Sequence, residues 1–503
     1  MNTFMRILRK VSPQLSLPFL VIFCALIFTF LPIRTYSQAS PNIVLFLADD
    51  MAWFDAGAYG SEQAITPNID KLASEGMRFD NMFTSTAMCA PTRQQLYTGL
   101  WPVRNGAYPN HSWVYNSVKS IPHYFGAQGY RTALAGKDHF GPPEAFPFER
   151  LSTKLSTDST FERIEEFVKR DSNQPFFLVV TSNEPHVPWN RGNVELFPSN
   201  ELTIPSYLVD CRETRKEMTK YLAEIKAMDE ELGKCMDIIG QSSKLKENTL
   251  FIFTSEQGSQ FPFGKWTCYD HGLKTAFIVR WPRKVAPGSS NDALTQYIDV
   301  VPTLLEAAGI DWKNVQTGAV DEYGNANFDG ESFMDVLTGV SSTHRKYVFG
   351  IHTTRGILDG SESYPIRSIR SDKYLYIRNL SFGSAFRNVT LVRNSERLIE
   401  PWRQIGQTDE QAMARTTFYE YRPYEELYDV VRDPNHLHNL AMEETYTHIK
   451  KPLGANLSEW MKQQGDWGVA TEMEAKFRQK AYLIRNPNAN HKGYQPPRPN
   501  NKE

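Results

Sequence analysis

Cysteine is scarce in this chain, which has five cysteines among 503 residues. Cys24 lies in an apolar N-terminal segment, so that Cys89, Cys211, Cys235 and Cys268 remain for the rest of the chain. Four thiols in so long a chain do not make a disulfide framework, although one pair is free to form a bridge. The fold must therefore depend on buried apolar surface, and the length suits a large domain with a smaller partner.

An excess of charge of one sign is also lacking. The 55 lysines and arginines balance 57 aspartates and glutamates, and the formal net charge is -2. This balance gives no electrostatic reason to expect a nucleic-acid partner, although it is compatible with a local basic pocket. After residue 40 the chain has no internal repeat and no apolar run long enough to span a membrane, so we expect no stable membrane partner.

Residues 1–38 have the pattern of a signal peptide. Arg6, Arg9 and Lys10 precede an apolar run over residues 17–31 and a polar stretch over residues 34–39. We therefore expect an exported protein, periplasmic or extracellular, or in a lysosome-like lumen if the host is eukaryotic. An uncleaved membrane anchor is the alternative.

Four short apolar segments predict buried strands of an α/β sheet, and acidic, basic or imidazole side chains follow each one. The segments are residues 42–48, 130–135, 176–180 and 249–254. Ligands of open α/β sheets gather at the carboxyl ends of the strands. We therefore expect a single functional site along one edge of the sheet.

The strongest local signal is the segment Cys89-Ala-Pro-Thr-Arg93, which is followed by Thr98-Gly99. This pattern resembles the signature of the sulfatase family, in which a maturation enzyme oxidises the cysteine to formylglycine. The hydrate of that aldehyde offers two hydroxyls on one carbon: one attacks sulfur, and deprotonation of the other re-forms the aldehyde as sulfate leaves. Taken alone, Cys89 would be a small buried apolar residue, but its surroundings favour the catalytic interpretation.

The resemblance covers most of the chain and implies an α/β, alkaline-phosphatase-like fold, with a large mixed sheet between helices and a smaller C-terminal α+β subdomain. Residues 39–345 would form the catalytic domain, and residues 346–485, with short alternating strands, the subdomain. Residues 486–503 are expected to be a disordered tail. Segments 141–144 and 363–368 are most similar to the heparan N-sulfatase branch of the family.

The second signal is a set of oxygen donors. Asp49 and Asp50 follow the first predicted strand, and Glu256 and Gln257 follow the fourth. Hard oxygen ligands select calcium, with magnesium as the second choice, over zinc. By resemblance, these four residues and residue Cys89 form the metal site, although the family usually has Asp-Asn or Asp-His where this chain has the longer Glu-Gln. A turn or a helix cap is the alternative role for the aspartate pair.

Basic and imidazole residues are the third signal. Charge shifts on sulfate during its transfer, so a site of this kind needs preorganised cations. By resemblance, Arg93 orients the hydrate, and Lys137 and Lys265 hold sulfate oxygens. His139 is the candidate base, and His186 binds sulfate or protonates the leaving group. Structural roles are the alternative for the histidines.

Three further residues are candidate substrate contacts. His271 follows Lys265 closely and is a second candidate acid or a substrate contact, with a structural role as the alternative. His352 and Arg355 belong to the predicted C-terminal subdomain. We expect these two side chains to reach over the rim of the pocket and contact the sugar.

The resemblance implies a sulfuric ester hydrolase that acts on a sulfated carbohydrate in polysaccharide degradation. Aromatic faces stack on sugar rings, and tryptophans lie near the predicted site loops, at Trp53, Trp101, Trp113, Trp189 and Trp266. The alternatives are a sulfamate (N-sulfoglucosamine) hydrolase, a formylglycine-dependent phosphonate or phosphodiester hydrolase, and an inactive carbohydrate-binding homologue. The sequence leaves open which sugar is bound and whether an O–S or an N–S bond is cleaved.

Overall fold

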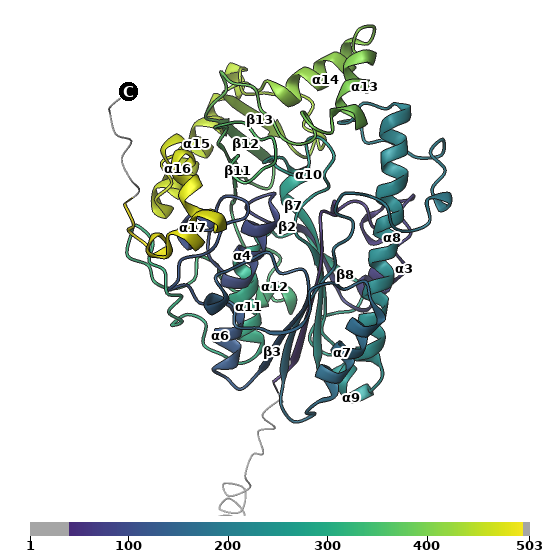
Figure 1. Cartoon of the computed structure of the whole chain (residues 1–503), viewed down its shortest axis with the longest axis vertical. Coiled ribbons are helices and arrows are strands. Elements are labelled where there is room, and N and C mark those ends of the chain that lie inside the picture. Colours follow the sequence, from purple (N-terminus) through teal and green to yellow (C-terminus); the bar gives the residue numbers. More distant parts are fainter. Residues whose placement is uncertain (1–39, 496–503) are drawn as a thin grey trace, which may run out of the picture. The chain divides into compact units, whose positions relative to one another are not determined.

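The first predicted strand lies in the middle of a nine-stranded sheet. In the computed structural model, which describes residues 40–495, this strand is β1 (Asn42–Ala48), and the sheet order is β4-β3-β5-β1-β6-β7-β2-β8, with β9 paired to β2 (Figure 1). The other strands are β2 (Met77–Phe83), β3 (Arg131–Gly136), β4 (Glu149–Ser152), β5 (Phe176–Thr181), β6 (Thr249–Ser255), β7 (Lys274–Arg280), β8 (Ser289–Asn291) and β9 (Thr295–Gln296). Four of these nine strands, β1, β3, β5 and β6, coincide with the four apolar segments that the sequence predicts to be strands.

The four predicted strands run in the same direction. β1 pairs in parallel with both β5 and β6, and β3 pairs in parallel with β5. Their carboxyl ends therefore meet at one edge, as the sequence predicts. β7 runs antiparallel to β6 and to β2, which makes the sheet mixed.

Side chains of β1 alternate between two apolar layers, because successive residues of a strand point to opposite faces. Val44 and Phe46 pack in one core with Leu222 of α8 (Arg212–Gly240), whereas Ile43 and Leu45 pack in a second core. Each large apolar side chain buried in this way contributes about 1.5–3 kcal/mol to folding. A sheet covered on both faces explains why the sequence of β1 is a continuous apolar run.

Helices cover both faces of the sheet (Figure 1). One side carries α3 (Pro67–Glu75), α7 (Asp158–Lys169), α8 (Arg212–Gly240) and α9 (Ser243–Glu247). The other side carries α4 (Cys89–Thr98), α6 (Ile121–Gly126), α11 (Val300–Ala307) and α12 (Met334–Leu337). Shorter helices are α5 (Pro102–Asn105), α10 (Asp270–Leu273), and the 3-10 turns η1 (Gly57–Tyr59), η2 (Pro143–Ala145), η3 (Val194–Leu196) and η4 (Tyr297–Asp299).

A second, four-stranded antiparallel sheet follows in the C-terminal part, as expected. Its order is β10 (Val348–His352), β11 (Ile366–Arg370), β12 (Tyr374–Asn379) and β13 (Glu425–Asp429). The helical elements around it are α13 (Ile399–Ile405), α14 (Glu410–Glu420), α15 (Thr447–Gln464), α16 (Val469–Glu474), α17 (Lys480–Arg485), η5 (Ser395–Arg397), η6 (Glu444–Tyr446), η7 (Ala475–Arg478) and η8 (Pro487–Asn490).

The small sheet is joined to the loops of the large one. The amide of Ile351 donates to the carbonyl of Ser85 (2.7 Å), and the Tyr269 hydroxyl donates to Glu426 Oε2 (2.7 Å). Residues 40–495 accordingly belong to one compact unit. The boundary at residue 345 stays a prediction.

The ends of the described segment bear on two further predictions. The predicted signal peptide, residues 1–38, lies outside the described residues, as do residues 496–503 of the expected tail. Within that tail, Pro487–Asn490 form η8, and buried Asn490 accepts a hydrogen bond from Arg478 (3.0 Å). The expectation of disorder from residue 486 therefore does not fit residues 487–490, because Arg478 fixes them. Among the helices between residues 40 and 495, none is long and apolar enough to cross a membrane.

Candidate active site

The carboxylates of Asp49 and Asp50 lie at the carboxyl end of β1, fully buried. Asp50 has φ 68°, in the left-handed region, so the chain turns sharply as it leaves the strand. The amide of Glu256 donates to the carbonyl of Ala48 (3.0 Å), which continues the pairing of β1 with β6 beyond the strand ends. Strand pairing thus brings the two acidic segments together, as the sequence predicts.

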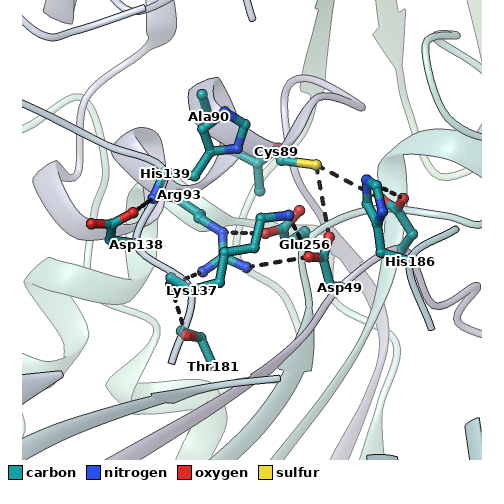
Figure 2. A network of polar contacts seen from close by, with 12 residues as sticks. Asp49, Cys89, Ala90, Arg93, Lys137, Asp138, His139, Thr181, His186 and Glu256 are labelled. Carbon is teal, nitrogen blue, oxygen red and sulfur yellow. Dashed lines mark hydrogen bonds and ion pairs between the residues drawn. The ribbon is translucent and has the colours of Figure 1, made fainter. Parts of the chain in front are cut away.

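Cys89 is the first residue of α4 and faces these carboxylates (Figure 2). Its Sγ atom lies 3.7 Å from Asp49 Oδ1 and 3.9 Å from Asp50 Oδ1, and the residue is 2% exposed. Burial raises the pKa of the Cys89 thiol, but the ammonium groups of Lys137 and Lys265 outweigh this effect and lower the pKa to about 6. The site thus stabilises negative charge at residue 89, despite the two neighbouring carboxylates.

Four side chains at this point have a geometry suited to a metal ion. Ligand atoms of Asp49, Asp50, Cys89 and His186 all lie within 4.8 Å of one another. Figure 2 shows the imidazole of His186 turned toward Cys89, and its Nε2 atom lies 3.6 Å from Asp50 Oδ2. The predicted metal site included the first three of these residues but not His186.

Gln257 and Glu256, the other two predicted ligands, differ in position. The Gln257 amide lies against the cluster, with Nε2 2.5 Å from Asp50 Oδ1 and 3.4 Å from Cys89 Sγ. Its Oε1 atom is buried and has no hydrogen-bond partner among residues 40–495. Buried polar atoms normally have partners, so two carboxylates beside this free oxygen fit a hard cation. Glu256, by contrast, forms an ion pair with Arg93 Nε and accepts from Gln257 Nε2 (3.2 Å).

Three cations surround the carboxylates. Lys137 pairs with Asp49, Lys265 Nζ lies 2.5 Å from Asp50 Oδ2, and Arg93 pairs with Glu256. Burial alone would raise the pKa of Asp49, but Lys137, His186 and Arg93 hold it well below its usual range. Three buried cationic side chains thus lie directly against the three carboxylates of the site, an arrangement in which each charge has a partner.

His139 lies on the loop after β3 and pairs with a histidine that the sequence analysis did not select. Its Nε2 atom is 2.8 Å from Nδ1 of His111, and its own Nδ1 is buried without a partner among the described residues. Burial lowers the pKa of His139 to about 3 and that of His111 to about 4, with nearby cations adding to the effect. Both rings are therefore neutral at neutral pH. No motif marks His111, because only the fold places it beside His139.

The three predicted substrate contacts lie in different surroundings. His271 is buried, stacks on Tyr207 with ring centroids 3.9 Å apart, and lines a separate pocket. His352 is 1% exposed, and neither ring nitrogen has a partner among the described residues. The predicted position of His352 on a pocket rim is therefore wrong, because the surrounding side chains enclose its ring.

Arg355 has a backbone link to the site. Its carbonyl accepts from the amide of Asn110 (3.1 Å), and the Asn110 side-chain oxygen accepts from the amide of Ala90 (3.5 Å). Ala90 follows Cys89 directly, so Arg355 comes close to the start of α4 through one intermediate residue. The contact of Arg355 with substrate stays a prediction.

Comparisons with known proteins identify the family of the chain. A family model described as "Sulfatase" matches residues 41–310, and one described as "N-sulphoglucosamine sulphohydrolase, C-terminal" matches residues 258–378. An ulvan-active sulfatase of Formosa agariphila is 34% identical over 85% of this chain and 81% of its own length. The N-sulphoglucosamine sulphohydrolase of Homo sapiens is 27% identical over 86% of this chain and 92% of its own length.

Solved structures of low sequence identity share the fold. A protein in complex with its substrate D-glucosamine-2-N,6-O-disulfate is 20% identical and superposes with a TM-score of 0.65 over 85% of this chain and 99% of its own. The phosphonate monoester hydrolase of Agrobacterium radiobacter is 16% identical and superposes with a TM-score of 0.63 over 84% and 96%. The fold is thus alkaline-phosphatase-like, and this chain belongs to the sulfatase family, whose members hydrolyse sulfate esters or sulfamates.

Proposed function

We propose that this enzyme removes sulfate from a sulfated carbohydrate by means of formylglycine formed from Cys89 and a calcium ion held beside it. The observation that carries the proposal is the position of Cys89, buried between the Asp49–Asp50 pair and the ammonium groups of Lys137 and Lys265. As a hydrate, formylglycine would supply the nucleophilic hydroxyl and a second hydroxyl for sulfate release. A formylglycine-generating maturation enzyme is therefore an obligatory partner.

The metal would be held by Asp49, Asp50 and the free oxygen of Gln257, next to residue 89. All three are oxygen donors, which favours calcium over softer metals. Bound calcium would act as a Lewis acid on a sulfate oxygen. Glu256 contributes indirectly, because its carboxylate fixes the guanidinium of Arg93.

Cations of the chain bind and orient the sulfate group in this proposal. Lys137 and Lys265 both lower the pKa of Cys89, which means that their charge reaches the reacting position. Arg93 donates from one terminal nitrogen to the carbonyl of Lys137 (2.7 Å), and its other terminal nitrogen has no hydrogen bond among the described residues. That free N–H group is available to residue 89 or to a sulfate oxygen. Such preorganised donors stabilise the charge that develops during transfer.

Two histidines suit opposite proton-transfer roles. Burial and Lys265 lower the pKa of His186, but Asp50 and Asp49 outweigh them and raise it to about 9, so the ring carries a proton at neutral pH. His186 can therefore protonate the leaving oxygen or nitrogen. His139 is neutral and has an unpartnered Nδ1, which suits it to accept a proton from the hydrate. The different environments of the two histidines thus suit His186 to act as the acid and His139 to act as the base.

A carbohydrate substrate is supported by what the relatives act on. One is described as an ulvan-active sulfatase, and another as an N-sulphoglucosamine sulphohydrolase. The match of residues 258–378 to the C-terminal model of the latter enzyme favours a sulfamate hydrolase as the second candidate. We further propose that residues 1–38 direct export to the periplasm or the cell exterior, and that residues 39–345 form the catalytic domain.

The test is release of inorganic sulfate by the mature chain co-expressed with a formylglycine-generating enzyme. The panel contains N-sulfated glucosamine, heparan fragments, chondroitin sulfate, ulvan and carrageenan oligosaccharides, with a phosphonate monoester as the alternative substrate. Sulfate release that is lost in Cys89→Ala supports the proposal and identifies the linkage. If mass spectrometry shows converted residue 89 and only the phosphonate is hydrolysed, the proposal is wrong.

A further inference from the structure

A second pocket lies next to the loops that carry the active-site residues. Its volume is about 320 Å³, within the range of small-ligand sites, and it shares no lining residue with the cluster around Cys89. Trp53 reaches it from the segment after Asp50, and His271 from α10, which follows the loop that carries Lys265. In Figure 1, α10, which contains His271, lies between the large sheet and the C-terminal sheet.

Among the described residues, Lys274 supplies the unpaired positive charge of this pocket. It is the first residue of β7, and its Nζ atom lies 3.9 Å from the centre of the Trp53 ring. Unlike Lys137 and Lys265, its ammonium group forms no hydrogen bond or ion pair with any residue between 40 and 495. A half-buried cation without a carboxylate partner is costly to desolvate, and a bound anion would offset that cost.

The other charged groups leave the pocket with one net positive charge. Arg370 is already paired, because its Nε atom lies 3.2 Å from Asp270 Oδ2. Burial lowers the pKa of His271 to about 3, so its ring is neutral. Asp270 and, more weakly, Asp80 also attract the Lys274 ammonium, and Asp80 is paired with Arg78. One oxyanion, such as a sulfate monoester or a carboxylate, therefore matches the free charge.

Aromatic rings make up much of the rest of the lining. The Tyr207 ring stacks on His271, and the Trp53 ring lies edge-on to Phe54, with centroids 5.6 Å apart. These contacts fix the rings before a ligand binds. A rigid aromatic wall with a charged group beside it suits a sugar ring that carries an acidic substituent, because sugars present apolar C–H faces to aromatic side chains.

We propose that this pocket is a second saccharide site, in which Lys274 binds the sulfate or carboxylate of one sugar unit while another unit lies at Cys89. The inference rests on the proposed function in taking the ligand to be an acidic polysaccharide. The two sites are built from neighbouring stretches of the chain, because Trp53 follows Asp50 and His271 follows Lys265. The pocket would then raise the affinity for long substrates without taking part in the chemistry.

The test measures binding without turnover, in the full chain carrying Cys89→Ala. Ulvan and heparan sulfate oligosaccharides, their desulfated and carboxyl-reduced counterparts and inorganic sulfate are titrated calorimetrically. Adding Lys274→Met should weaken oligosaccharide binding about tenfold, the loss of one favourable charge contact. Lys274→Arg should retain most of the affinity. The matched control is Lys284→Met, an exposed lysine in the turn after β7 that forms no ion pair with a described residue.

Equal affinity of the Lys274→Met variant and its parent for the oligosaccharides, or equal losses of affinity in Lys274→Met and Lys284→Met, would overturn the inference. Loss of binding to inorganic sulfate alone would mean a free-anion site and no saccharide site. Activity separates the two proposals: if the wild-type chain releases no sulfate but Lys274 still controls oligosaccharide binding, the proposed function fails and the second site stands.

Discussion

At the scale of single residues, the side chain of Gln257 has one hydrogen-bonded polar atom and one free polar atom among the described residues. Its Nε2 donates to Asp50 Oδ1, while its Oε1 stays buried without a donor among the described residues. We expect Gln257→Met, which keeps the length and removes the oxygen, to weaken calcium binding about tenfold or more. Calcium titration of the melting temperature measures this effect.

Gln260→Met provides the matched control. Gln260 lies on the same loop, is also buried, and makes no side-chain hydrogen bond with a described residue. Its calcium response should equal that of the wild type. An unchanged response in Gln257→Met would remove Gln257 from the metal site and leave the two aspartates as its protein carboxylates.

The residue types and their positions after strands predict which residues come together at the sheet edge. They do not predict which side chains form ion pairs or hydrogen bonds with one another. The sequence predicts that Asp49, Asp50 and Cys89 lie close together, as they do, because an acidic pair after an apolar run and a short signature can both be recognised without the fold. The ion pair of Glu256 with Arg93 joins residues 163 positions apart, and no local pattern encodes it. His352 was misplaced for a similar reason, since burial of a lone histidine depends on packing that the sequence does not display.

At the scale of elements, the end of β3 sets the position of Lys137. Gly136 has φ +98°, and a Cβ atom there would lie 2.0 Å from the carbonyl oxygen of Thr181 in β5. Gly136→Ala must therefore push β3 and β5 apart or turn Lys137 away from Asp49. We expect a loss of at least about tenfold in kcat/KM, because small displacements of catalytic groups are costly.

Gly129→Ala separates this effect from backbone strain. Gly129 precedes the same strand with φ +81°, but nothing lies within 4 Å of an added Cβ atom. Both variants therefore pay for a left-handed alanine, about 1 kcal/mol. Only Gly136→Ala should lose activity, as measured by sulfate release at saturating and limiting substrate. Equal losses in the two variants would show that strain alone is responsible.

Strands that are buried on both faces are easier to predict from the sequence than strands with half-buried residues. β1, β5 and β6 are buried on both faces and therefore have continuous apolar sequences. The sequence does not predict β2, because it mixes Met, Phe, Arg, Asp and Asn, and three of its seven residues are only half-buried. Its place in the sheet comes from pairing with β7 and β8, which are far away in the chain.

At the scale of the whole molecule, enclosed neutral histidines should make folding sensitive to acid. Burial, with Arg422 and Arg367 nearby, lowers the pKa of His352 well below its usual range, and burial lowers that of His271 to about 3. Below pH 6.5 the unfolded chain takes up protons at these positions while the folded chain does not. Each such histidine therefore lowers the free energy of unfolding by about 1.4 kcal/mol per pH unit.

His352→Leu should reduce this dependence, because the unfolded variant gains no proton at residue 352. Between pH 7 and pH 5 the free energy of unfolding should fall by about 2 kcal/mol less than in the wild type, measured by urea denaturation. His448→Leu, which removes an exposed histidine of α15, should leave the wild-type dependence intact. An identical pH dependence in His352→Leu and the wild type would mean that His352 takes up a proton in the folded state. Because His352 lies at the end of β10, next to the loop that leads to Arg355, that result would place a charged ring where the C-terminal sheet meets the active-site loops.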